Sequence, residues 1–456
     1  MKKNIILDTD SYKLSHYKQY PPGTEHVFSY IESRGGLFES TLFFGLQKAL
    51  IELNEHFPDW DDFQEAKQLA SAHGVPFNEQ GWRDLITLGF FPLEIRAAQE
   101  GKVIETQNVL VTVVNTDPRF YWLTSYLETS LLRAVWYPTT VATLSFECKK
   151  VINRYMLATC DSTAGLGFKL HDFGARGVSS EESAGIGGAA HLVSFLGTDT
   201  LSAIRCSQRY YDAGVCGFSI PATEHSTITS WGREHELEAY RNVLEQFPEG
   251  LIACVSDSYD IFNAVNNMWG GALKDQVEKR QGTLIIRPDS GDPEDILPLL
   301  LESLGERFGF ELNTKGYKVL NNKVRLIQGD GVKLSSLGRI LEIMTAKGWS
   351  TENIAFGMGG GLLQQLNRDT QKFAMKNSAV RINGQWRDVY KDPVTDHGKR
   401  SKKGILDLYQ GKTVRIDAAQ LFAKRQHSDL NVVYKNGKLL NVLSFQSIRQ
   451  NADSCL

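Results

Sequence analysis

Short apolar runs followed by glycine, aspartate, arginine or serine recur along the middle of the chain. After each run, apolar positions take up helical spacing, so that strand and helix alternate. The pattern occurs at Phe168–Gly174, Leu251–Ser258, Leu284–Gly291, Val324–Gly331 and Asn353–Gly361. Uniformly apolar strands that alternate with helices predict a parallel sheet covered on both faces, which is an α/β fold.

The polar residues that follow these strands are the first indication of function. In α/β sheets and barrels, ligands bind at the carboxyl ends of the strands. This sequence concentrates Asp, Arg and Gly at those ends. One such loop could be an ordinary turn. Five in series, with arginine and aspartate directly after the strands, predict a binding site.

The flanking segments have a different pattern. In the N-terminal segment, the spacing predicts a strand at Val27–Ile31, a helix at Leu42–Asn54, half-buried strands in Lys102–Val114 and a helix at Phe120–Val135 that Trp136-Tyr137-Pro138 follows. Near the other end, Leu430–Leu443 is typical of a hairpin with a tight Asn436-Gly437 turn. We expect residues 1–150 and 380–456 to form a β-rich α+β domain, and residues 151–379 to form the α/β part.

Composition narrows the class of protein. Apolar residues make up 42% of the 456 residues and charged ones 23%, which argues against disorder. The net charge of −3 argues against nucleic-acid binding, so any bound anion must be held locally. Six cysteines without CxxC spacing predict reduced thiols and no zinc site. Asp8 and Asp10 interrupt the N-terminal apolar run, and no stretch is long enough to span a membrane, which predicts a cytoplasmic protein.

Two glycine-rich stretches invite opposite interpretations. Gly357–Gly361 follows a predicted strand and opens a predicted helix at Leu362–Arg368, where free N–H groups attract a phosphate. A tight turn is the alternative, and no Walker motif is present. No strand precedes Gly185–Ala189, and Ser179–Glu182 resembles a capping box, so we interpret those glycines as helix packing.

The acidic loops suggest a sugar phosphate. Asp289 and Asp330 each follow a strand, and carboxylates accept hydrogen bonds from ribose hydroxyls or hold Mg²⁺ through water. Arg287 beside Asp289 combines a phosphate ligand with a sugar ligand, unless the two simply pair with each other. His225, next to Glu224, is either a structural histidine or an imidazole oriented for nucleophilic or acid–base work. Spacing does not decide between these readings.

Motifs along almost the whole chain resemble the nicotinamide phosphoribosyltransferases, a type II phosphoribosyltransferase family. They are Asp10–Lys13, His16–Pro22, His171–Gly174, Gly197–Thr200, Glu224–Thr227, Ser256–Asp260, Arg287–Gly291, Gln328–Gly331 and Gly359–Leu363. The resemblance implies a pentosyltransferase of NAD salvage, which makes nicotinamide mononucleotide and pyrophosphate from nicotinamide and phosphoribosyl pyrophosphate. It also implies an irregular α/β barrel, a homodimer with shared active sites, Mg²⁺ accompanying the phosphates, and ATP as co-substrate.

The resemblance further implies roles for individual residues. Phe173 and Tyr12 of the partner subunit would sandwich the pyridine ring, and Asp199 would accept the carboxamide N–H. The ribose and phosphate groups would be bound by Arg287, Asp289, Gly329, Asp330, Gly359, Gly360, Arg176, Arg34 and Lys391, with Arg368 and Lys376 of the partner subunit. Catalysis would fall to His225, Glu224, Asp257 and Asp289. In this family the counterpart of His225 is phosphorylated by ATP, and that hydrolysis drives synthesis.

Three positions depart from the animal members of the family, and three alternatives stay open. Ala253 and Ala374 stand where those enzymes have serine, and Ala175 where they have tyrosine, which changes details of the amide and phosphate contacts. One alternative is transfer to nicotinate or quinolinate, against which Asp199 argues because those acids need a cationic partner. Another is a non-catalytic binding protein on an enzyme scaffold. An aldolase-like barrel would need a Schiff-base lysine, and the five strand ends offer none.

Overall fold

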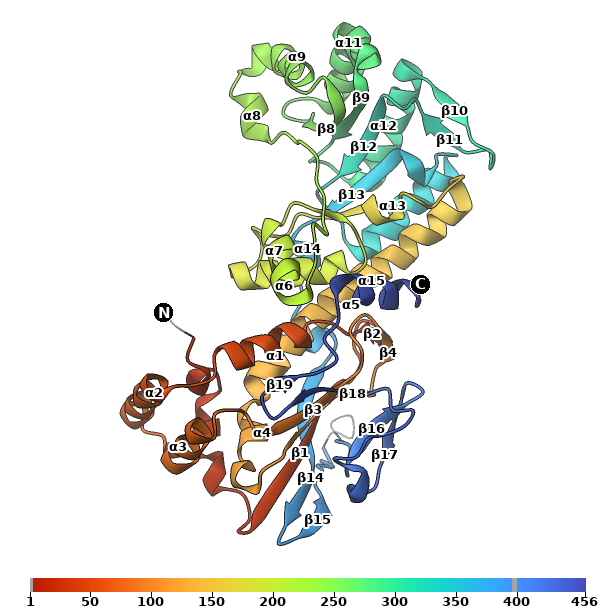
Figure 1. The fold of residues 1–456 in the computed structure, drawn as a ribbon. Coiled ribbons are helices and arrows are strands. Elements are labelled where there is room, and N and C mark those ends of the chain that lie inside the picture. Colours follow the sequence, from red (N-terminus) through yellow and green to blue (C-terminus); the bar gives the residue numbers. More distant parts are fainter. Residues whose placement is uncertain (1–2, 396–399) are drawn as a thin grey trace. The chain divides into compact units, whose positions relative to one another are not determined.

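The computed structural model describes residues 3–395 and 400–456, and its chain forms two compact units (Figure 1). The first unit comprises residues 1–143, 209–213 and 367–456, and the second comprises 144–208 and 214–366. The sequence had suggested divisions near residues 150 and 380. Helix α5, Glu128–Thr159, continues from one unit into the other.

A seven-stranded antiparallel sheet organises the first unit, in the order β15-β14-β1-β5-β3-β18-β19. Its strands are β1 (Thr24–Ser33), β3 (Leu93–Ala97), β5 (Val109–Asn115), β14 (Phe373–Ile382), β15 (Gln385–Asp388), β18 (Asn431–Lys435) and β19 (Lys438–Leu439). Strands of the N-terminal segment form the centre of this sheet and strands of the C-terminal segment flank them on both sides, which confirms the expected β-rich domain. The β18–β19 hairpin turns at Asn436-Gly437 as predicted, with both residues at positive φ.

Helices and two small hairpins complete this unit. They are α1 (Leu46–Glu55), α2 (Trp60–His73), α3 (Glu79–Leu88), α4 (Leu123–Tyr126) and α15 (Phe445–Asp453), with the pairs β2 (Ser40–Leu42)–β4 (Val103–Glu105) and β16 (Leu406–Tyr409)–β17 (Lys412–Arg415). One apolar core joins the sheet, the helices α1 to α4 and β16 (Figure 1).

Three local predictions for this segment were wrong, each for a packing reason. The helix expected from Leu42 begins at Leu46, because Leu42 belongs to β2. Strand β5 is buried at all seven residues rather than on alternate ones, because the apolar core lines both of its faces. Helix α5 runs through Pro138 rather than ending before it. Val135, Val141 and Ala142 are fully buried there, which offsets the roughly 3 kcal/mol that an internal proline costs.

A parallel sheet in the order β7-β6-β13-β12-β9-β8 forms the centre of the second unit. Its strands are β6 (Leu170–Asp172), β7 (Gly197–Thr198), β8 (Glu249–Val255), β9 (Gln281–Arg287), β12 (Val324–Gln328) and β13 (Ile354–Met358). All five strands predicted from the apolar runs are present. The sheet buries apolar side chains such as Ile252, Leu284 and Phe356. Burial is less complete than the pattern predicted, because the first three residues of β8 are exposed and β9 is buried only at two positions.

The segment Phe218–Ala222 links the two edge strands of this sheet. Phe218 bridges to Gly197 of β7 and Ala222 to Ala253 of β8, both in parallel sense. The Thr198 N–H donates to the Phe218 carbonyl at 2.9 Å, and the Ala253 N–H donates to the Pro221 carbonyl at 3.0 Å. The sheet therefore closes on itself as an irregular barrel, which confirms the predicted fold class.

Helices follow the barrel strands along the chain. They are α6 (Glu181–Leu192), α7 (Leu201–Tyr211), α8 (His225–Thr229), α9 (Glu236–Gln246), α10 (Ile261–Asn263), a π-helix (Ala264–Ala272), α11 (Lys274–Lys279), α12 (Pro293–Phe308), α13 (Leu334–Ala346) and α14 (Gly360–Leu363), with the pair β10 (Phe310–Leu312)–β11 (Lys318–Leu320). An added Cβ on Gly188 would lie 2.6 Å from Cβ of Ala203, so the Gly185–Ala189 glycines serve helix packing as interpreted. The cap of α6 is Ser180 rather than Ser179.

The helix expected at Leu362–Arg368 is much shorter. Helix α14 begins at Gly360 and ends at Leu363, and Arg368 belongs to a separate 3₁₀ turn that falls in the first unit. Asn367 is extended, and its side chain accepts from the N–H groups of Asp369 and Thr370, so the chain starts a new turn there instead of continuing the helix to Arg368.

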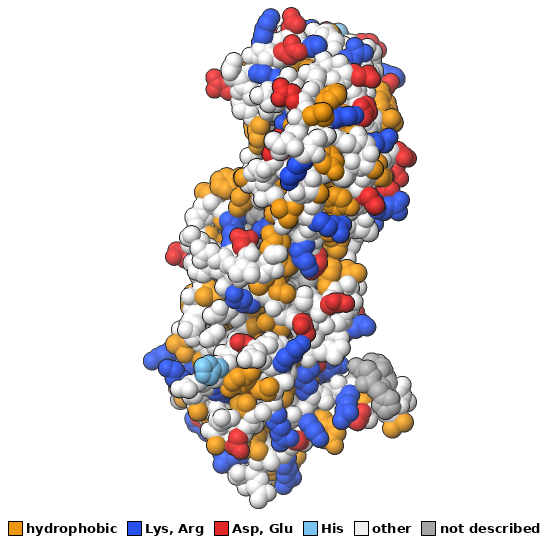
Figure 2. Space-filling view, turned by 90° about the vertical axis from the view of Figure 1, so that its right-hand side faces the viewer, with side chains coloured by type: hydrophobic (Ala, Val, Ile, Leu, Met, Phe, Trp, Pro, Cys, Tyr) orange, Lys and Arg blue, Asp and Glu red, His pale blue; other side chains and the backbone are white. Residues whose placement is uncertain are grey.

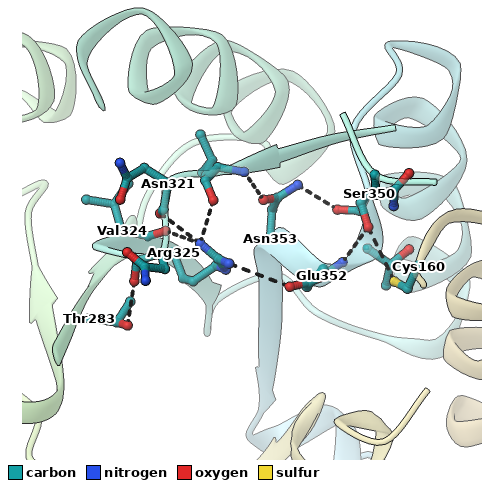
Figure 3. Close-up of polar contacts among 12 residues, drawn as sticks. Cys160, Thr283, Asn321, Val324, Arg325, Ser350, Glu352 and Asn353 are labelled. Atoms are coloured by element: carbon teal, nitrogen blue, oxygen red, sulfur yellow. Dashed lines mark hydrogen bonds and ion pairs between the residues drawn. The ribbon is translucent and has the colours of Figure 1, made fainter. Parts of the chain in front are cut away.

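Polar contacts tie the amino ends of the barrel strands together (Figure 3). Nη1 of Arg325 donates to the carbonyls of Leu320, Asn321 and Val324, and its Nη2 lies 3.7 Å from Oε1 of Glu352. The fully buried Asn353 accepts from the Leu320 N–H at 2.7 Å and donates to two carbonyls. These groups bond to neighbouring backbone, so this end of the barrel is built for stability.

Replacing Asn353 with leucine should lower the free energy of unfolding by about 2 kcal/mol, because the buried Leu320 N–H loses its acceptor. Urea denaturation followed by far-UV circular dichroism measures the change. The matched control is Glu352→Gln on the adjacent residue, whose side chain is 47% exposed, and which should stay within about 0.5 kcal/mol. Equal effects of the two variants would contradict this account.

The described surface carries mixed charge, and no helix in the described ranges is both long and apolar enough to cross a membrane. On the face in Figure 2, lysine and arginine side chains lie among acidic and apolar ones. A phosphorylated ligand is therefore not drawn to a general positive field, and specific groups must bind it.

Candidate active site

The predicted site residues of the second unit lie at the carboxyl ends of the barrel strands. They are Phe173 after β6, Asp199 after β7, Glu224 and His225 after the closing segment, Asp257 after β8, Arg287 and Asp289 at the end of β9, Gly329 and Asp330 after β12, and Gly359 and Gly360 after β13. Parallel strands bring these ends to one rim of the barrel. Residues more than 180 positions apart in sequence thus share one site.

His225 is held by a buried carboxylate. Its Nε2 lies 3.0 Å from Oδ1 of Asp257, whose side chain is only 4% exposed. The other oxygen of Asp257 accepts hydrogen bonds from the Asp289 N–H, at 3.0 Å, and from the Ser290 hydroxyl. The imidazole itself is 44% exposed, and its Nδ1 lies 3.8 Å from Oδ2 of Asp289. A half-exposed ring with one nitrogen anchored can take part in nucleophilic or acid–base chemistry.

Glu224 lies directly before α8, the helix that begins at His225. Its side chain is exposed, and Oε1 accepts a hydrogen bond from the Ser226 hydroxyl. Its backbone carbonyl accepts from the Thr227 hydroxyl at 2.9 Å. Glu224 therefore fixes the first turn of the helix that presents His225.

Arg287 keeps hydrogen-bonding capacity for a ligand. Its Nε lies 4.0 Å from Oδ1 of Asp289, beyond hydrogen-bond length. Among the described residues this Nε is buried without a hydrogen-bond partner, although the side chain is 19% exposed. Arg287 and Asp289 thus form a long ion pair but no hydrogen bond, so the mutual pairing considered from the sequence is present only in part. A guanidinium with free donors in a site is well suited to an anion.

Glycine makes room for the Phe173 ring. A Cβ added to Gly357 would lie 1.9 Å from Cε2 of Phe173, and one added to Gly329 would lie 3.3 Å from the same atom. The Phe173 N–H donates to the Met358 carbonyl at 3.0 Å, which fixes the backbone on β13. The half-buried ring thus packs against Gly357 of β13 and Gly329 after β12. The next turn carries Arg176, whose side chain is exposed.

Asp199 has a partner that sequence reasoning missed. The Ser219 hydroxyl donates to Oδ1 of Asp199 at 2.5 Å. Ser219 belongs to Phe218–Ala222, the segment that closes the barrel. This segment lacks the apolar run typical of a buried strand, because Ser219 and Pro221 interrupt it. Since a hydroxyl has one proton, this bond leaves Oδ2 of Asp199 to accept from a ligand.

The first unit gathers the other predicted cations. Burial lowers the pKa of Lys376, and the positive charges of Arg34, Lys391 and Lys13 lower it further, against an opposing effect of Glu128. Neighbouring cations of this kind favour a bound anion. Tyr12 lies on the 3₁₀ helix Ser11–Lys18 with its ring 57% exposed. Arg368 is exposed and pairs with Asp369 at 3.3 Å.

The barrel with its rim of arginine, carboxylates and glycines defines an α/β-barrel enzyme that binds its ligand at the strand ends. Comparison with known proteins gives the family. A model of the nicotinate phosphoribosyltransferase family matches residues 168–438, and one of the nicotinamide phosphoribosyltransferase N-terminal domain matches residues 4–95. The chain therefore belongs to the nicotinate phosphoribosyltransferase family and is a phosphoribosyltransferase, which is a pentosyltransferase.

Curated relatives share this family, and solved structures share the fold. A nicotinamide phosphoribosyltransferase of Xanthomonas campestris pv. campestris (strain 8004) is 52% identical, over 99% of this chain and 98% of that protein. A nicotinamide phosphoribosyltransferase of Acinetobacter baylyi is 34% identical, over 98% of this chain and 96% of that protein. In fold, the chain is similar to nicotinate-nucleotide pyrophosphorylase from Pyrococcus furiosus, with a TM-score of 0.62 and 14% identity. The match covers 99% of this chain and 95% of the other. The chain is also similar in fold to human nicotinic acid phosphoribosyltransferase, with a TM-score of 0.59 and 15% identity. That match covers 98% of this chain and 93% of the human one.

Proposed function

We propose that this phosphoribosyltransferase joins nicotinamide to phosphoribosyl pyrophosphate, and releases nicotinamide mononucleotide and pyrophosphate, in NAD salvage. The observation that carries the proposal is Asp199 at the barrel rim, held by Ser219 with one oxygen left to accept. A carboxylate accepts the N–H of a carboxamide and repels the carboxylate of nicotinate. The names of the two curated relatives support the same substrate.

Each loop supplies one part of the proposed reaction. Phe173 stacks on the pyridine ring and directs its nitrogen toward C1 of the ribose, which saves entropy in the transition state. As the new C–N bond forms and the bond to pyrophosphate breaks, positive charge builds on the sugar and negative charge on the leaving group. Arg287 and Arg176 neutralise the leaving group. The glycines at 359 and 360 leave space for the 5′-phosphate.

Mg²⁺ fits this scheme as a companion of the substrate phosphates. The described part of the chain has no group of three or more His, Cys, Asp or Glu side chains arranged to hold a metal ion. Asp289, which is 30% exposed, and Asp330 offer carboxylates to the waters of a phosphate-bound ion. When bound, the ion would add positive charge at the leaving pyrophosphate.

We extend the proposal to ATP as co-substrate. The ring nitrogen of His225 that Asp257 does not engage attacks the γ-phosphorus of ATP, and ADP leaves with the electrons of the broken P–O bond. Water later cleaves the N–P bond and releases phosphate. The anchored, half-exposed imidazole supports this role. A homodimer with shared active sites and a cytoplasmic location stay predictions.

The test is formation of nicotinamide mononucleotide by the purified protein with phosphoribosyl pyrophosphate and Mg²⁺, with nicotinate in a parallel reaction and with or without ATP. We expect product from nicotinamide, more of it with ATP, and little from nicotinate. Product from nicotinate alone would keep the phosphoribosyl chemistry and refute the role of Asp199. No product from either would favour a binding protein on an enzyme scaffold.

Replacing Asp199 with serine should lower the preference for nicotinamide over nicotinate about tenfold or more, because the charge that repels the acid is removed. The ratio of kcat/KM values for the two substrates measures it. The matched control is Asp275→Asn on α11, whose side chain is 84% exposed. An unchanged ratio in the Asp199 variant would refute the assigned contact.

A further inference from the structure

Asp172 is a fully buried carboxylate at the barrel rim, and the proposed reaction does not use it. It is the last residue of β6, it directly precedes Phe173, and its exposed fraction is 0%. We propose that Asp172 is a positioning residue that fixes both the aromatic wall and the amide acceptor of the nicotinamide site.

Hydrogen bonds connect Asp172 to both parts of that site. Its Oδ1 accepts from the Gly174 N–H at 2.7 Å, which closes the turn around Phe173. Its backbone carbonyl accepts from the Asp199 N–H at 3.0 Å. In register, Asp172 is opposite Thr198 of β7 on one side and Met358 of β13 on the other. One residue thus fixes the start of the loop that carries Phe173 and the start of the loop that carries Asp199.

The carboxyl group has little freedom to turn. A Cβ added to Gly188 of α6 would lie 2.9 Å from Oδ2, and one added to Gly174 would lie 3.1 Å from Oδ1. Only glycine at these two positions lets helix and turn approach so closely. The close approach confines the carboxylate, so its hydrogen bond to Gly174 holds the turn in one conformation.

Burying the Asp172 carboxylate costs free energy of folding, so we expect the carboxylate to have a function beyond packing. Burial raises the pKa of Asp172 to about 6, and the charge of Asp199 raises it as well, whereas the Gly174 N–H and the hydroxyls of Thr200 and Thr198 lower it. Packing alone would be served better by an apolar side chain. Above that pKa the group is ionised, and an ionised acceptor binds an N–H more strongly than a neutral one.

The consequence is selective for one substrate. The turn held by Asp172 carries Phe173. Apart from Arg176 in the next turn, the residues of this unit assigned to the sugar phosphate come from β9, β12 and the loop after β13. Loosening the turn should therefore weaken binding of nicotinamide and leave phosphoribosyl pyrophosphate almost unaffected. The inference rests on the proposed function, because it uses the assigned contacts of the ring.

The experiment compares Asp172→Ala and Asp172→Asn in the full-length protein without ATP, so that His225 chemistry does not contribute. The alanine variant should raise KM for nicotinamide about tenfold and KM for phosphoribosyl pyrophosphate less than about twofold. The asparagine variant keeps a neutral acceptor for Gly174 and should restore part of the affinity, to about the level of the enzyme with Asp172 protonated. Equal shifts of both KM values, or asparagine no better than alanine, would overturn the proposal.

The pH dependence gives a second readout, which a merely structural residue would not move. In the unmodified enzyme, kcat/KM for nicotinamide should fall as the pH drops through about 6, because protonation weakens the acceptor. Asp172→Asn has no such group and should lose that inflection, which decides the matter even where the alanine variant does not fold. An inflection shared by both proteins would overturn the proposal. Failure of the proposed function is distinct, because the unmodified enzyme would then make no product from nicotinamide.

Discussion

Replacing Gly357 with alanine should lower kcat/KM for nicotinamide about 1,000-fold. The added methyl group would lie 1.9 Å from Cε2 of Phe173, which is far inside van der Waals contact. The neighbouring backbone of β13 is paired on both sides, so the aromatic ring must move instead. Loss of stacking costs about 1–3 kcal/mol, and displacement by about 1 Å can cost a further factor of about 100.

The measurement is the initial rate of nicotinamide mononucleotide formation over a range of nicotinamide concentrations. The control is Gly338→Ala in α13, where the nearest atom to an added Cβ is 3.8 Å away, in Val151. That variant should keep its activity and gain about 0.5–1 kcal/mol of stability, since alanine favours a helix. Full activity of the Gly357 variant would show that the ring does not form the substrate wall.

Replacing His225 with alanine should abolish the gain that ATP gives and leave a basal rate of transfer. At saturating ATP we expect the rate to fall at least about 100-fold, in the range typical of a lost catalytic imidazole. The reason is geometric, because the ring anchored by Asp257 is the group oriented for phosphorylation. Acid-labile phosphate on the protein after brief exposure to γ-labelled ATP provides the direct readout.

The matched control is His235→Ala, at a histidine in the same unit whose side chain is 65% exposed. That variant should incorporate phosphate and respond to ATP as the unmodified protein does. An undiminished response to ATP in the His225 variant would refute the phosphohistidine, while the role of Asp199 in selecting nicotinamide would still stand.

The apolar runs predicted most of the barrel, and the residues after them predicted most of its rim. A buried parallel strand is recognisable because both of its faces are apolar, and its polar successor must then lie at the carboxyl end. This reasoning placed Arg287 and Asp289 at the rim, whereas Phe173 came from the resemblance to the family. It missed Ser219, because a segment that touches the barrel only through two bridges needs no apolar pattern. It also gave α14 too great a length.

Local sequence determined the elements, the fold class and the types of side chain at the rim, since these depend on periodicity and composition within short windows. Tertiary structure alone decided three other matters. It closed the barrel through Phe218–Ala222, it placed His225 on the buried Asp257, and it set the Phe173 ring against Gly357. Each of these joins residues at least 20 positions apart. Only the packed chain brings such residues together, because the spacing of residues within a short window carries no information about which distant segment will be the neighbour.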